Sequence, residues 1–284
     1  MKSHTSPLTE RKKLDELYAS YNHRAFVHPD PLEFLYDFPE LLDREIVALI
    51  ASSLAYGRVS QILKSVSSVL DRMSPSPFRF IMNSPLELLR STFSDFKHRF
   101  TGGDELSWML WGARRAIEQY GSLLQWFLTG YSDDDDTILP ALSKFVRAFL
   151  GKRPGRWEGF MPSPNKGSAC KRLNLFMRWM VRQDAVDPGG WNRIPASKLI
   201  IPLDTHMHRI ALSLGLTKRR QADMRTAIKV TAAFREIVPE DPVRYDFVLT
   251  RLGIRRDMDQ EAFFGSCGIA YGQPHLIAGR KERP

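Results

Sequence analysis

The chain has few cysteines and no long apolar run, and both absences narrow its possible classes. It contains two cysteines among 284 residues, Cys170 and Cys267. One chain therefore supplies neither a disulfide framework nor the four thiolates of a zinc or iron–sulfur site. No apolar stretch approaches the roughly 18 residues of a membrane span, and the N-terminus lacks the apolar core of a signal peptide. We expect a cytoplasmic protein with no membrane partner and no cofactor.

Acidic residues are also in short supply. The 32 acidic side chains are outnumbered by 41 basic ones, which gives a formal net charge of +9. Net charge describes association rather than fold, and a positive excess favours a polyanionic partner, with nucleic acid as the first candidate. The length fits one large domain or two smaller domains that pack closely together.

Convincing strand patterns are missing too, and helical periodicity runs through most of the chain. Residues 41–56 place apolar side chains at helical spacing, Gly57 interrupts the pattern for one residue, and residues 59–73 resume it. Two Asp-Pro pairs, at Asp30 and Asp241, are typical of helix starts. Further helices are expected at 9–21, 77–81, 85–91, 105–120, 123–129, 138–150, 170–182 and 222–238. The sequence therefore predicts an all-α fold.

A basic, loop-rich segment at 151–169 leads directly into the helix expected at 170–182, with Lys171 at its start. A cation is disfavoured at the positive end of a helix dipole, and Lys166, Arg172 and Arg178 add like charge nearby. These effects favour the neutral amine that nucleophilic attack on carbon requires. Lys171 is therefore a candidate nucleophile, and the alternative is a solvated lysine on a basic surface.

A second candidate is Asp204, which ends the apolar stretch 199–203 and opens a short helix that stops at Gly215. Its local interpretation is a helix cap, because an Asp oxygen accepts the free amide hydrogens of a first turn. The other interpretation is a carboxylate that faces a cleft. The connection at 183–198 is long enough to return the chain alongside Lys171, so the spacing permits a pair without requiring one.

Three segments resemble a family of bacterial proteins of unknown function that is itself similar to the helix-hairpin-helix DNA glycosylases. They are Cys-Lys171-Arg-Leu-Asn-Leu-Phe-Met-Arg, Pro-Leu-Asp204-Thr-His-Met-His-Arg and Asp-Pro-Val-Arg-Tyr-Asp246-Phe. The Asp204 segment is similar to the one that supplies the catalytic aspartate in endonuclease III-like enzymes, and 49–58 resembles their early helix and gap-filling loop. The resemblance implies two helical lobes with a cleft between them: 1–44 with 200–284, and 45–199 with the hairpin at about 160–172.

The usual Leu-Pro-Gly-Val-Gly hairpin is absent, and 33 positions separate Lys171 from Asp204, a longer layout that resembles the archaeal 8-oxoguanine glycosylases. By that comparison Lys171 is the nucleophile and Asp204 stabilises charge on the sugar. The implied base pocket contains Leu175, Arg178, Asp246 and Thr250. Thr250 stands where an aromatic stacking residue is expected, so the lesion and the base opposite it stay open.

The same resemblance implies a set of DNA contacts. Phosphates would be held by Arg153, Lys166, Gly167 and Arg172. The Tyr56-Gly57-Arg58 turn either fills the space left by an extruded base or is an ordinary helix break. The expected partner is double-stranded DNA that contains a damaged base. We expect a monomer associated with the nucleoid of a bacterium.

These observations predict a DNA repair N-glycosylase with AP lyase activity, which excises an oxidised purine such as 8-oxoguanine through a lysine Schiff base. One alternative is a non-catalytic helix-hairpin-helix protein that binds DNA. The other is a metal-dependent amidohydrolase, since His206-x-His208 after an apolar run looks like the first metal-binding strand of such barrels. The helical patterns that follow argue against that barrel.

Overall fold

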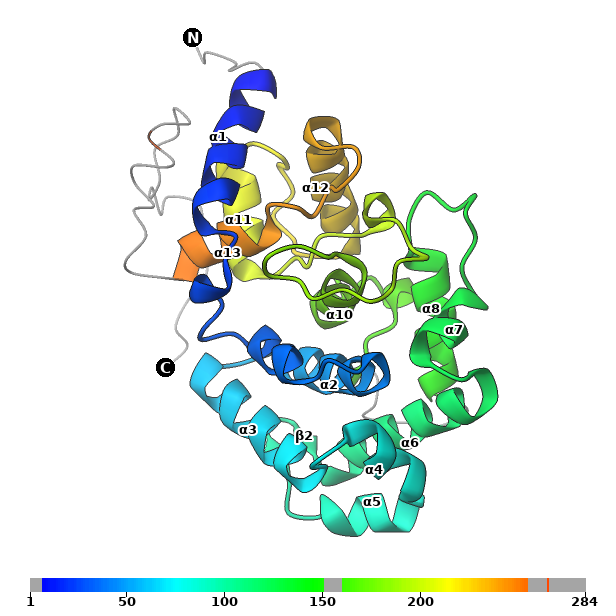
Figure 1. The fold of residues 1–284 in the computed structure, drawn as a ribbon. Helices are drawn as coiled ribbons and strands as arrows, with labels where there is room; N and C mark the ends of the chain where they lie inside the picture. The colour runs from blue at the N-terminus through cyan, green and yellow to red at the C-terminus, as the bar shows by residue number, and fades with distance from the viewer. Residues whose placement is uncertain (1–6, 151–159, 255–264, 266–284) are drawn as a thin grey trace, which may run out of the picture.

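The computed structural model describes residues 7–150, 160–254 and 265, and helices dominate this part of the chain (Figure 1). The all-α class is confirmed. None of the described helices is long and apolar enough to cross a membrane. The α-helices are α1 (Pro7–Tyr21), α2 (Leu41–Ser53), α3 (Val59–Arg72), α4 (Pro77–Asn83), α5 (Leu86–Thr92), α6 (Gly103–Tyr120), α7 (Leu123–Leu128), α8 (Leu139–Leu150), α10 (Lys171–Val181), α11 (Thr205–Ser213), α12 (Met224–Ile237) and α13 (Asp246–Ile254).

Short elements connect these helices. The 3-10 turns are η1 (Arg24–Phe26), η2 (Pro31–Asp37), η3 (Pro164–Lys166) and η4 (Ala196–Lys198). Strand β1 (Lys97–His98) pairs antiparallel with β2 (Thr101–Gly102), and this two-residue hairpin is the one sheet in the described ranges. The sequence shows no strand here because two residues are too few to display a period of two.

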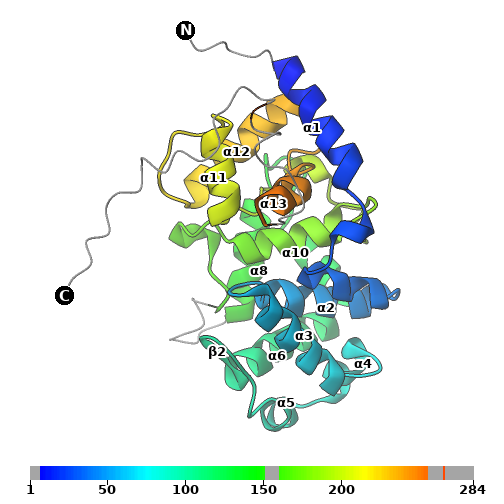
Figure 2. The ribbon, with the colours of Figure 1, turned by 90° about the vertical axis from the view of Figure 1, so that its left-hand side faces the viewer.

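Helices α2 and α10 pack against each other in the middle of the molecule. Both views place α3 to α6 on one side of this pair and α1, α11, α12 and α13 on the other (Figures 1 and 2). The central position explains why α2 is buried from Glu45 to Ser53 and α10 from Leu173 to Val181. The Glu45 carboxylate is buried as well, and it accepts hydrogen bonds from the amides of Leu123 and Leu124 and from the Trp191 indole.

Two predicted helix boundaries are wrong, and tertiary contacts explain both. Helix α2 ends at Ser53, so the break before α3 spans five residues instead of Gly57 alone. The loop is held by the Tyr56 hydroxyl, which lies 2.8 Å from the His98 carbonyl oxygen and 2.7 Å from Thr101 Oγ1. The helix expected from Asp241 begins at Asp246. The Asp241 carboxylate accepts from Arg182 instead of capping that helix.

Candidate active site

A cavity of about 370 Å³ lies where the α2–α3 loop, α10, the start of α11 and α13 meet. One stripe of α10, formed by Lys171, Leu175 and Arg178, lines it. These positions share a face because they are four and three residues apart on a helix. Asp204 and Asp246 line the same cavity from the first turns of α11 and α13. The structure therefore brings the two residues of the predicted catalytic pair to one cavity with the predicted base pocket.

Lys171 is the first residue of α10, and the preceding Cys170 has a left-handed backbone with φ 48°. The Lys171 Nζ donates a hydrogen bond to the Ala55 carbonyl oxygen at 3.2 Å. It lies 4.0 Å from Asp204 Oδ2, with about a quarter of each side chain exposed. The amine is thus held between the α2–α3 loop and the N-cap of α11, and it reaches the cavity from the positive end of its own helix.

The two oxygens of Asp204 have different partners. Oδ1 accepts from the amides of His206 and Met207, both at 2.9 Å, so Asp204 is the N-cap of α11 as predicted. Oδ2 is the atom nearest to Lys171 Nζ. Because Oδ1 anchors the carboxylate to the helix, Oδ2 is aimed at the amine in a fixed direction. Capping and cavity-facing, the two interpretations of Asp204, are therefore compatible.

Asp246 is the first residue of α13 and is 2% exposed. Its Oδ2 accepts from Arg178 Nη1 at 2.5 Å, whereas its Oδ1 is buried with no hydrogen-bond partner among the described residues. Burial raises the pKa of Asp246 to about 6, with Arg178 opposing the shift and the Asp204 charge adding to it. A buried polar atom without a partner is costly, so Oδ1 is a group that a ligand in the cavity can satisfy.

Arg178 lines the cavity, but its guanidinium is committed to protein carboxylates. Its Nε and Nη2 donate to Asp187 Oδ1 at 3.2 and 3.0 Å, and its Nη1 binds Asp246. Burial by itself would lower the pKa of Arg178, but Asp187 and Asp246 outweigh it and hold the pKa above its usual value. Arg178 therefore positions Asp246 and stays positively charged beside it.

The remaining predicted pocket residues, Leu175 and Thr250, also line the cavity. Sequence reasoning missed Phe247, which lies one turn before Thr250 on α13 and supplies an aromatic ring where Thr250 has none. It also missed Asp30, which caps η2 through the Leu32 amide and forms an ion pair with Arg251 beside the cavity. The Asp30-Pro31 pattern is fully explained as a cap, so nothing in the sequence indicates this second contact.

The predicted DNA contacts are scattered. Tyr56 and Gly57 line the cavity, and Arg58 is exposed at the start of α3. Lys166 and Gly167 are exposed, but their amides bond within the turn to the carbonyl oxygens of Ser163 and Pro164.

Arg172 faces elsewhere. It donates to the Ser53 carbonyl oxygen at 2.8 Å and lines a second cavity instead of the one that contains Lys171. Arg153 lies outside the described residues.

The two histidines of the His-x-His pattern lie on α11, so the interpretation of this segment as a metal-binding strand is wrong. His208 Nε2 lies 2.8 Å from the Arg219 carbonyl oxygen, and His206 lines the cavity. Positions two apart on a helix point in different directions, which separates the two imidazoles.

Comparison with known protein families gives a match over most of the chain. A family model described as "Protein of unknown function (DUF2400)" matches residues 30–255. The matched range includes Lys171, Asp204 and Asp246 of the candidate site. Neither the curated proteins nor the solved structures contain a match to this chain.

Proposed function

Since the chain belongs to this family of unknown function, DUF2400, we propose its function from the site itself. We propose a DNA N-glycosylase with AP lyase activity that excises an oxidised purine such as 8-oxoguanine. The proposal includes a helix-hairpin-helix glycosylase-like fold with two helical lobes. The observation that carries it is the Lys171 amine at the wall of the 370 Å³ cavity. The amine lies 4.0 Å from Asp204 Oδ2, which the helix cap aims at it.

The cavity has the size and lining that a nucleobase needs. Its volume of about 370 Å³ lies in the range of small-ligand pockets, about 300–1,000 Å³. Phe247 contributes a buried aromatic ring to the cavity wall, and Asp246 Oδ1 offers a hydrogen-bonding group to the edge of the base. An enzyme that acts on the bond between base and sugar must first extrude the nucleotide, because that bond is out of reach inside the duplex.

Lys171 and Asp204 then have separate roles. The Lys171 nitrogen forms a bond to C1′ while the bond from C1′ to the base breaks. The base leaves with that electron pair and takes up the proton that the amine releases. Positive charge develops on the sugar, and the nearby Asp204 carboxylate stabilises it in a site of reduced dielectric. The sugar ring then opens: the bond from C1′ to O4′ breaks, the second proton of the amine moves to O4′, and the nitrogen lone pair forms an imine between Nζ and C1′. Loss of a C2′ proton from this imine expels the 3′ phosphate.

Borohydride trapping tests this proposal, because it reduces the imine to a stable covalent bond. Duplexes that carry 8-oxoguanine or a natural abasic site are incubated with the protein and borohydride. We expect a covalent complex with the natural sequence and none with Lys171→Ala. Lys229→Ala, which removes an exposed lysine of α12, serves as the matched control and should trap normally. Absence of a complex from both duplexes contradicts the mechanism.

The net charge of +9 favours a second candidate, a DNA-binding protein without catalysis. It predicts salt-dependent duplex binding that is indifferent to Lys171→Ala, together with no trapping. The two candidates therefore differ in one measurement, because both predict binding and only the first predicts a covalent bond.

A further inference from the structure

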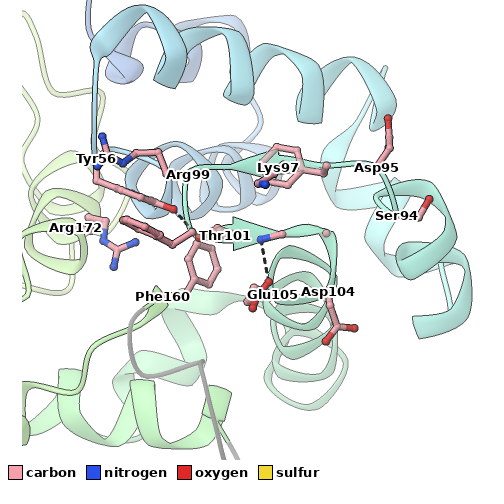
Figure 3. A pocket seen from close by; sticks show the side chains of 14 residues that line it. Tyr56, Ser94, Asp95, Lys97, Arg99, Thr101, Asp104, Glu105, Phe160 and Arg172 are labelled. Carbon is pink, nitrogen blue, oxygen red and sulfur yellow. Dashed lines mark hydrogen bonds between the residues drawn. The ribbon is translucent and has the colours of Figure 1, made fainter.

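The two cavities do not account for the positive charge of this chain. The second cavity, of about 1,080 Å³, is lined by three acidic and three basic side chains (Figure 3): Asp95, Asp104, Glu105, Lys97, Arg99 and Arg172. The first cavity has the same balance, with three of each sign: Asp30, Asp204, Asp246, Lys171, Arg178 and Arg251. The excess of +9 therefore comes from side chains outside both cavities.

One segment carries a large share of that excess. Residues 209–225, from α11 to the first turn of α12, contain five basic side chains and one acidic one, a net charge of +4. The acidic one, Asp223, is engaged, because its Oδ1 accepts from the Thr226 amide at 2.8 Å and its Oδ2 pairs with Arg219. The other four cations are exposed and form no ion pair or side-chain hydrogen bond within the described residues: Arg209, Lys218, Arg220 and Arg225. We refer to these four as the basic surface.

The loop that carries Lys218 and Arg220 is tied to both neighbouring helices by the residue between them. Arg219 Nε donates to Thr226 Oγ1 on α12 at 2.9 Å. The Arg219 carbonyl oxygen lies 2.8 Å from His208 Nε2 on α11. One cation is thus spent on holding the loop, and its two neighbours are presented to solvent from a fixed backbone. Such preorganisation lowers the entropic cost of contacting a ligand.

The basic surface adjoins the candidate active site at two points. Arg209 follows Asp204 by five positions, which is about 8 Å along α11 at about 1.5 Å per residue. At the other point, the Met224 amide beside Arg225 donates to the carbonyl oxygen of Gly167, in the turn that leads into α10, at 3.0 Å. Each strand of a duplex carries one phosphate per about 3.4 Å of helix axis. A strand with a nucleotide extruded into the first cavity can therefore reach Arg209 with a phosphate only about two positions away.

Charge rather than apolar area distinguishes this surface. Leu212 and Ile228 are the exposed large apolar side chains of α11 and α12, at 38% and 41%. A helix that lies on a membrane buries a continuous apolar face in the lipid. The apolar faces of α11 and α12 are instead buried in the protein core. The partner that the surface fits is therefore a polyanion.

We propose that the basic surface binds the sugar-phosphate backbone of duplex DNA beside the candidate active site. This inference rests on the proposed function, because it takes DNA as the partner. Phosphate contacts carry no sequence information, so the surface holds damaged and undamaged duplexes alike. It thereby keeps the protein on undamaged DNA during the search for a lesion, a role that is separate from the chemistry at Lys171.

The test measures how strongly the affinity for an undamaged duplex depends on salt. Each phosphate contact contributes about 0.9 to the slope of log Kd against log salt concentration. We expect the double variant Lys218→Gln/Arg220→Gln to lower this slope by about 1.8. The matched control Arg79→Gln/Arg115→Gln removes two exposed cations from α4 and α6, on the far side of the α2–α10 pair (Figures 1 and 2), and should keep the natural slope. Ile228→Ala should keep it too, because phosphate contacts use charge.

Three results overturn the inference: an unchanged slope in Lys218→Gln/Arg220→Gln, an equal fall of the slope in the control on α4 and α6, and a loss of affinity in Ile228→Ala as large as that in the charge variant. The second result means that net charge alone sets the affinity, and the third means that the surface binds through apolar area.

Trapping at Lys171 by the natural sequence is scored separately. Trapping together with an unchanged slope in the charge variant refutes the basic surface alone. The expected fall of the slope without any trapping refutes the glycosylase and leaves a protein that holds duplex DNA through this surface.

Discussion

Single atoms decide what Asp204 does, because one of its oxygens caps α11 and the other faces Lys171. Asparagine caps helices about as well as aspartate, and it can keep the capping oxygen while removing the charge. We therefore expect Asp204→Asn to leave the free energy of unfolding within about 0.5 kcal/mol of the natural value. Excision should fall by about a hundredfold or more, the usual effect of losing one electrostatic contact to a transition state.

Asp204→Ala is the comparison for this variant. It loses both functions, so it should excise as slowly as Asp204→Asn and also be less stable by about 1 kcal/mol. The measurements are single-turnover excision and urea unfolding. A charge-free Asp204→Asn protein that excises at the natural rate would leave Asp204 with capping as its only role.

A second single residue, Asp246, makes the free energy of unfolding depend on pH. Its pKa is about 6 in the folded protein, chiefly through burial, against an ordinary value of 3.8. The folded state therefore holds this proton more tightly than the unfolded state. The stabilising contribution is complete below about pH 4 and is lost as the pH rises through about 6. We expect Asp246→Asn to remove this part of the pH dependence.

The measurement is urea unfolding at pH 4.5, 5.5 and 7 for both proteins. The charged groups that face Asp246 are Arg178, Asp187 and Asp204, and all three remain in the variant. Other buried acids still titrate, Glu45 among them, whose pKa burial raises. The difference between the two proteins is therefore the informative quantity. If that difference does not change with pH, Asp246 does not titrate in this range.

At the scale of elements, the α2–α3 loop depends on a glycine. Gly57 has φ 102°, and a Cβ there would lie 2.7 Å from Arg99 Cδ. Gly121, which ends α6, has φ 90° but no atom within 4 Å of a Cβ. Both alanine variants pay the backbone cost of about 1 kcal/mol or more, and Gly57→Ala must also displace Arg99. We expect Gly57→Ala to be the less stable of the two in thermal unfolding.

The difference between the two variants reports how firmly Arg99 is held, because only Gly57→Ala has to displace it. Equal destabilisation by both substitutions would mean that Arg99 moves aside freely.

Local chemistry was sufficient to predict many elements, and long-range contacts explain the failures. Apolar periodicity and the Asp204 cap placed α10 and α11 within a residue or two, since both features act inside one helix. Helix α13 begins at Asp246 because Asp241 pairs with Arg182, 59 positions earlier. No local pattern contains that ion pair.

The candidate site shows the same contrast: local patterns predicted some of its residues, and long-range contacts explain the rest. The sequence showed that Lys171 and Asp204 could meet, but their 4.0 Å approach depends on the α2–α3 loop, in which the Ala55 carbonyl oxygen anchors the amine. Phe247 and Asp30 were missed because each has an ordinary structural interpretation, as a buried aromatic and as a cap. The second cavity was missed because it needs a hairpin of two-residue strands beside a loop 42 positions away.

Across the whole molecule, a buried charge network connects segments from both ends of the chain. Asp187 is 0% exposed and accepts from Arg178 and Arg182. Arg178 continues the network to Asp246 on α13, and Arg182 continues it to Asp184. Asp184 accepts from the Tyr18 hydroxyl on α1 at 2.8 Å. The network thus joins α1, α10 and α13 around the back of the first cavity.

We expect Asp187→Ala to destabilise the protein by about 3–5 kcal/mol, because it leaves two buried guanidinium groups without their shared carboxylate. Glu118→Gln, which breaks the surface pair with Arg114, is the control and should change stability by less than about 0.5 kcal/mol. Since the network joins three helices, urea unfolding of Asp187→Ala should stay a single transition at lower urea. If α1 instead unfolds in a separate step, the network does not make the two ends of the chain cooperative, and Asp187 supports only the Arg178–Asp246 pair at the cavity.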